Sequence, residues 1–128
     1  MAKRIVSTEH APAAIGAYSQ AVVIDSGRLV FCSGQIAIDP ATGKLLNGTV
    51  REQTERILVN LREVLDAADS SLDRVVKITV FLTDMDNFEE FNQAYAGFFT
   101  TDPPARATVE VSRLPKGAAI EMDAIAYI

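Results

Sequence analysis

Residues 104–122 read PARATVEVSRLPKGAAIEM. Two apolar, strand-like runs flank a Pro-Lys-Gly segment here, with Arg106 in the first run and Glu121 in the second. The planar fork of an arginine offers paired donors that suit a small carboxylate. A glutamate is able to orient or deprotonate a water. Together these two residues predict a pocket for a small organic acid that undergoes hydrolysis.

Both residues also have purely structural interpretations, which the sequence alone leaves open. Arg106 alternates with small neighbours and could pair with Glu110 on the same strand face. Glu121 could be a solvent-facing residue of an alternating strand.

The chain before this stretch predicts turns, strands and two helices. Residues 21–34 are typical of a hairpin around Gly27, and residues 39–43 of a second turn. Helical spacing of apolar residues predicts a helix from Thr49 to about Asp69, with Thr49 and Glu52 as a capping box. The other expected elements are a strand at 73–82 with Lys77 pointing outward, a helix at about 87–99 with Asp86 as N-cap, and strands at 106–111 and 119–127.

This order predicts an α+β fold, in which two helices pack on one face of a mixed six-stranded sheet. The strands are apolar at nearly every position, so both faces of the sheet should be buried. No third helix is expected to cover the second face. A homo-oligomer is therefore predicted.

Composition narrows the possible functions. The 128 residues, 48% hydrophobic and 23% charged, fit a single domain over 1–128. A net charge of −5 opposes binding to nucleic acid and to anionic membranes. Because Cys32 is the sole cysteine, a reducing compartment is expected, and no apolar run approaches membrane-spanning length. A cytoplasmic location follows as an expectation.

Four further residues are candidates for the pocket, and two of them, Asn92 and Tyr18, also have a structural alternative. Asn92 lies on the aromatic face of the second helix, where a buried amide more often fixes a loop backbone. Tyr18 could wall the pocket or simply pack with its hydroxyl at the rim. Ser33 precedes Gly34, which would let the backbone approach a ligand.

Other chemistries find no support in the sequence. One histidine, His10, and one cysteine, Cys32, cannot build a His/Cys metal site. A Ser-His-acid set is not expected either, because the lone His10 lies in the N-terminal stretch. No phosphate-binding or dinucleotide glycine motif is present. We therefore expect no bound metal.

Five motifs stand out along the chain: APAAIGAYSQ at 11–20, CSGQ at 32–35, FNQAYAGFF at 91–99, PARATVEV at 104–111 and RLPKGAAIEM at 113–122. With these motifs the chain resembles the Rid family of reactive intermediate deaminases, formerly called the YjgF family. The resemblance spans essentially the whole chain. It implies a fold similar to bacterial chorismate mutase and a homotrimer with ligand clefts between subunits.

The resemblance also implies an activity, namely hydrolysis of 2-imino acids such as 2-iminobutanoate and 2-iminopropanoate to 2-oxo acids and ammonia. Such imines are released by pyridoxal-phosphate dehydratases. Arg106 would hold the substrate carboxylate and Glu121 would activate water. No cofactor is needed, because a protonated imine carbon is already electrophilic. Residues implied to line the cleft are Tyr18, Ser33, Gly34, Asn92 and Thr108.

Two positions depart from the family pattern. Thr108 stands where many members have cysteine, which excludes thiol chemistry there, and Ala17 stands where many have proline. Two other functions remain open. One is a non-catalytic module that binds 2-oxo acids; the other is a translation-inhibiting, ribonuclease-like or chaperone-like protein, which the acidic charge disfavours.

Overall fold

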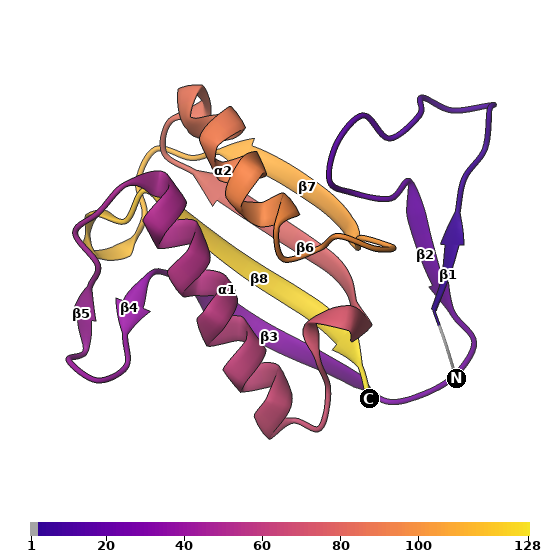
Figure 1. Cartoon of the computed structure of the whole chain (residues 1–128), viewed down its shortest axis with the longest axis horizontal. Coiled ribbons are helices and arrows are strands. Elements are labelled where there is room, and N and C mark those ends of the chain that lie inside the picture. The colour runs from indigo at the N-terminus through magenta and orange to yellow at the C-terminus, as the bar shows by residue number, and fades with distance from the viewer. Residues whose placement is uncertain (1–2) are drawn as a thin grey trace.

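A mixed four-stranded sheet lies at the centre of the computed structural model, which describes residues 3–128 (Figure 1). Its order is β3-β8-β6-β7, and only the β6–β7 pair is parallel. The register of β3 against β8 shifts between Cys32 and Gln35. The strands are β3 (Leu29–Gln35), β6 (Val75–Leu82), β7 (Ala105–Glu110) and β8 (Ile120–Tyr127).

Two helices, α1 (Val50–Ala67) and α2 (Phe88–Ala96), cover one face of this sheet (Figure 1). This arrangement confirms the predicted α+β fold with its helices on one side. Thr49 caps α1 as expected: its hydroxyl accepts from the Glu52 backbone N–H, and the Glu52 carboxylate accepts from the Thr49 backbone N–H. Neither described helix has the length and apolar character required to cross a bilayer.

The start of α2 differs from the prediction that Asp86 is the N-cap. A short 3₁₀ helix, η2 (Met85–Asn87), precedes α2, and the Asp84 side chain accepts from the Asp86 backbone N–H at 2.9 Å. Two further 3₁₀ helices are η1 (Leu72–Arg74) and η3 (Pro115–Gly117). The aspartate that acts as an N-cap is therefore Asp84, at the start of η2, and not Asp86 at the start of α2.

The sheet has four strands rather than six, because two pairs of strands form separate ribbons. β1 (Lys3–Val6) pairs with β2 (Ala21–Ile24), and β4 (Ile38–Asp39) pairs with β5 (Lys44–Leu45). The predicted hairpin over residues 21–34 is wrong, since β2 pairs with β1 and β3 with β8. Figure 1 shows the β1–β2 ribbon standing apart from the main sheet.

The two faces of the main sheet differ sharply. On the helix side the strand residues belong to the buried core, for example Ile78, Val80 and Met122. The opposite face, called the open face below, exposes large apolar side chains in the single chain. Phe31 is 70% exposed and Leu29 46%, and no helix of the described chain covers this face. Burial of the open face by a partner subunit stays a prediction. Lys77 is exposed, as predicted.

Candidate active site

Arg106 points to the helix side of the sheet. It is the second residue of β7 and lies in register with Ile78, a fully buried residue of β6. Paired residues of neighbouring strands project to the same face, so the arginine reaches toward α2. There its Nη1 donates a hydrogen bond to Asn92 Oδ1 at 2.8 Å. Asn92 thus fixes Arg106 rather than a loop backbone.

Four aromatic rings surround the Arg106 guanidinium. Their centroids lie 4.8–5.8 Å from its Cζ, which is within range for cation–π attraction. Three of them come from α2 at helical spacing, and the fourth precedes β2. The four rings are those of Tyr95 (4.8 Å), Phe91 (5.3 Å), Tyr18 (5.6 Å) and Phe88 (5.8 Å).

The charge of Arg106 has no carboxylate partner in the described chain. Arg51–Glu55 is the ion pair recorded among residues 3–128, and the predicted alternative partner Glu110 instead accepts from the Met85 backbone N–H at 2.8 Å. Burial lowers the pKa of Arg106, while Tyr95 and Tyr18 act in the opposite direction. A guanidinium still keeps its charge at neutral pH. This half-buried cation is therefore suited to receive an external anion.

Two hydroxyls near Arg106 are buried without a hydrogen-bond partner in the described chain. They are Thr108 Oγ1, two residues along the same strand face, and Tyr95 Oη under α2. Burial also raises the pKa of Tyr95 well above its ordinary value, although Arg106 opposes the shift. The Thr108 hydroxyl is thus enclosed in the single chain rather than open to a ligand.

Glu121 projects to the open face of the sheet. It lies in register with Phe81, three residues after Ile78 on β6, and an odd offset along a strand reverses the face. Its carboxylate lies directly against Gly34: a Cβ added at that glycine would meet Glu121 Cδ at 3.0 Å and Cγ at 3.3 Å. Ser33, next to Gly34, is exposed on β3.

The predicted residues therefore form two groups on opposite faces of one chain. The arginine group, defined as Arg106 with Tyr18 and Asn92, lies on the helix side. The glutamate group, defined as Glu121 with Ser33 and Gly34, belongs to the β3–β8 part of the open face. A single chain does not bring Arg106 and Glu121 into one pocket, which corrects the simplest form of the prediction.

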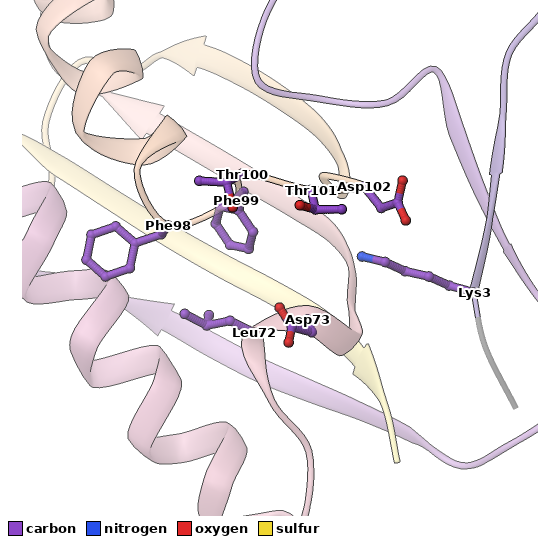
Figure 2. Close-up of a pocket in the computed structure, with 8 residues that line it drawn as sticks. All are labelled: Lys3, Leu72, Asp73, Phe98, Phe99, Thr100, Thr101 and Asp102. Carbon is purple, nitrogen blue, oxygen red and sulfur yellow. The ribbon is translucent and has the colours of Figure 1, made fainter.

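A hollow of about 330 Å³ elsewhere in the chain includes none of the predicted site residues (Figure 2). Lys3 of β1 projects into it between Asp73 and Asp102, and its Nζ donates to the Val75 carbonyl at 3.2 Å. Burial lowers the pKa of Lys3, and the two aspartates oppose that change. The hollow is lined further by Leu72, Phe98, Phe99, Thr100 and Thr101.

Neither the cysteine nor the acidic residues form a metal site in the described chain. Within residues 3–128 no group of three or more His, Cys, Asp or Glu side chains could hold a metal ion. Cys32 is buried in the core, where burial and the charge of Asp123 both raise its thiol pKa. A thiol in that setting is poorly reactive.

Comparison with known proteins adds to this geometry. The family model described as Endoribonuclease L-PSP matches residues 8–128. The chain belongs to the Rid family, also called the YjgF or RutC family. A RutC family protein of Pyrococcus abyssi is 49% identical over 127 residues, which is 99% of this chain and 98% of that protein. The 2-iminobutanoate/2-iminopropanoate deaminase of Rattus norvegicus is 48% identical over 97% of this chain and 89% of its own length.

Solved structures of Rid relatives support the fold. One from Thermotoga maritima is 51% identical with a TM-score of 0.77, over 98% of this chain and 97% of that one. TdcF of E. coli, solved with bound serine, is 38% identical with a TM-score of 0.75 and 98% coverage of both chains. Relatives of this Rid chain thus include named deaminases and a protein that binds a small amino acid.

The sequence-based prediction includes Tyr18 and the aromatic face of the second helix, but it does not connect that face with Arg106. Phe88, Phe91 and Tyr95 are the residues of that face whose rings surround the guanidinium. Their spacing places them on one helix face together with Asn92, and that shared face is the signal that could have linked them to the arginine.

Proposed function

We propose that this Rid protein hydrolyses 2-imino acids, such as 2-iminobutanoate and 2-iminopropanoate, to 2-oxo acids and ammonia. The observation that carries this proposal is Arg106: a half-buried guanidinium held by Asn92 and aromatic rings, with no ion pair recorded in the described chain. Such a group is prepared for the carboxylate of a small acid. The deaminase names of the mammalian relatives point to the same chemistry.

The chemical step needs binding, orientation and a base. Arg106 holds the carboxylate and thereby fixes the position of the imine carbon. Glu121 takes a proton from water as the water oxygen attacks that carbon, which forms a tetrahedral amino alcohol. Glu121 then gives this proton to the nitrogen and takes the proton of the new hydroxyl as the C–N bond breaks, so that ammonia and a 2-oxo acid are released. Holding water and imine together removes much of the entropic barrier.

The assembly proposed for this chemistry is a homotrimer in the cytoplasm. Because Arg106 and Glu121 point to opposite faces of one chain, a complete site requires the glutamate group of one copy to meet the arginine group of another. The exposed apolar open face next to Glu121 gives such a contact a driving force. Each cleft then lies between two subunits.

An imine-trapping assay tests the activity. A threonine dehydratase generates 2-iminobutanoate, and semicarbazide traps whatever imine remains. The protein should reduce the trapped signal, and Arg106→Ala should abolish this effect while thermal unfolding stays close to that of the wild type. An unchanged signal with wild-type protein would contradict the deaminase activity.

The same experiment separates the deaminase from a binding module. The serine bound to TdcF favours small-molecule binding as the second candidate function. If 2-oxobutanoate binds in calorimetry but imine is not consumed, the chain is a 2-oxo-acid sensor that uses the same arginine.

A further inference from the structure

We propose that Tyr95 is a positioning residue for Arg106. Its ring supports the guanidinium from the core side, and its hydroxyl accepts one of the guanidinium N–H groups. The role deepens the proposed function, because it concerns how the carboxylate-binding group is held. Tyr95 belongs to the same motif as Asn92, three positions further along the chain, and the substrate does not need to touch it.

The Tyr95 ring lies close to the Arg106 guanidinium and is held in place by its neighbours. Its ring centroid is 4.8 Å from Arg106 Cζ, the shortest of the four cation–ring distances. The side chain is fully buried and packs between Phe91 at 5.3 Å and Phe99 at 4.7 Å, centroid to centroid. A ring packed on both sides cannot move aside. It is therefore a fixed support for the guanidinium above it.

The hydroxyl of Tyr95 is buried and needs a hydrogen-bond partner. Buried polar groups are normally hydrogen-bonded, yet Tyr95 Oη has no partner within hydrogen-bond geometry in the described chain. Arg106 is the cation recorded against this ring, and its field acts on the hydroxyl. In the proposed arrangement, a guanidinium N–H of Arg106 is donated to Tyr95 Oη, the interaction that also opposes the rise of the tyrosine pKa. That contact satisfies a group that otherwise lacks a partner.

Arg106 has enough N–H donors to bind both Asn92 and Tyr95 and still receive a carboxylate. A guanidinium has five N–H donors, and Asn92 Oδ1 accepts one from Nη1. With Tyr95 accepting a second, the fork is fixed at two points, and further N–H groups stay available for a carboxylate. Fixing the fork before binding lowers the entropy lost when a ligand binds.

Tyr95→Phe tests this role because it removes the hydroxyl and leaves the ring. Tyr127→Phe is the matched control: Tyr127 is also buried, and its ring faces another arginine, with Arg74 Cζ at 5.9 Å. NMR of the arginine side chains in the ligand-free protein measures rotation about the Nε–Cζ bond of Arg106. Rotation should become several-fold faster in Tyr95→Phe and stay unchanged in Tyr127→Phe. Unchanged rotation in Tyr95→Phe overturns the proposal.

Kinetics give a second readout, which rests on the proposed function. Loss of one hydrogen bond to a charged group should raise KM for 2-iminobutanoate about tenfold in Tyr95→Phe, with kcat nearly unchanged. A purely structural hydroxyl would leave KM at the wild-type value, which also overturns the proposal. If the wild type itself consumes no imine, the deaminase activity is wrong, and the rotation of Arg106 alone decides the role of Tyr95.

Discussion

At the scale of single residues, the proposed carboxylate-binding group is Arg106, whose Nη1 donates a hydrogen bond to Asn92 Oδ1 at 2.8 Å. Arg106 was recognisable because a charged residue stands in an apolar strand. Its link to Asn92 depends on α2 packing over β7, and that packing is a property of the folded chain. The structural alternative for Arg106, a pair with Glu110, is not what the structure shows, because Glu110 binds the Met85 backbone instead.

A substitution at Gly34 tests whether the position of the Glu121 carboxylate matters for turnover. In Gly34→Ala the new Cβ would meet Glu121 Cδ at 3.0 Å, so the carboxylate must move. A displaced base should lower kcat for imine hydrolysis about tenfold or more, because catalysis is sensitive to small misplacements. The trapping assay measures this loss.

A matched alanine variant controls for the loss of a glycine. In Gly97→Ala the nearest atom to the new Cβ is the Ala94 carbonyl oxygen at 3.4 Å, and the backbone there is helical. It should retain wild-type kcat. Equal activity of Gly34→Ala and the wild type would show that the position of Glu121 does not matter for turnover.

At the scale of elements, local signals located helices and turns but not strand partners. The capping box of α1 was predictable because Thr49 and Glu52 interact within one turn. Gly27, at φ 122°, does take the positive φ expected of a turn residue. A turn signal does not specify which strands pair across it, and β2 and β3 separate into different sheets.

The first turn of α1 gives a stability prediction. Thr49→Ala removes the hydroxyl that accepts from the Glu52 backbone N–H at 3.1 Å. Loss of an N-cap should lower the free energy of unfolding by about 1 kcal/mol. Urea denaturation at neutral pH measures the change, and an unaltered midpoint would mean that the cap contributes nothing.

Glu52 adds a pH dependence to the same turn. Hydrogen bonds from the Thr49 backbone N–H and then from its hydroxyl lower the pKa of Glu52 below its ordinary value of 4.5. A group with a lower pKa in the folded state stabilises above its unfolded pKa, and this contribution is lost as the pH falls through the folded value. The difference in free energy of unfolding between wild type and Glu52→Gln should therefore be largest above pH 4.5. It should disappear as the pH falls further and Glu52 becomes protonated in the folded protein. A gap independent of pH would contradict this account.

At the scale of the whole molecule, the open face of the sheet is the dominant feature. Phe31, which is 70% exposed, lies in register with Ile125, two strand positions from Asp123 and four from Glu121 on β8. The sequence predicted an oligomer from strands that are apolar on both faces. It could not predict that Arg106 and Glu121 separate, because the face of each depends on its register with β6.

Phe31→Asp should disrupt the proposed assembly. A charge in the centre of an apolar contact is costly to bury. Light scattering should give a mass near one chain, and imine hydrolysis should be lost with it. Val64→Asp is the control, since Val64 is 40% exposed on α1 and remote from the open face. An intact oligomer in Phe31→Asp would exclude the open face as the contact.

Mixing two inactive variants tests the shared site most directly. Arg106→Ala and Glu121→Gln are each expected to be inactive, and they are co-refolded in equal amounts. If every site takes its arginine and its glutamate from different chains, about a quarter of the sites contain both, and about a quarter of wild-type activity should return. If both residues of a site came from one chain, every site would lack one of them, and a mixture with no activity would contradict the account.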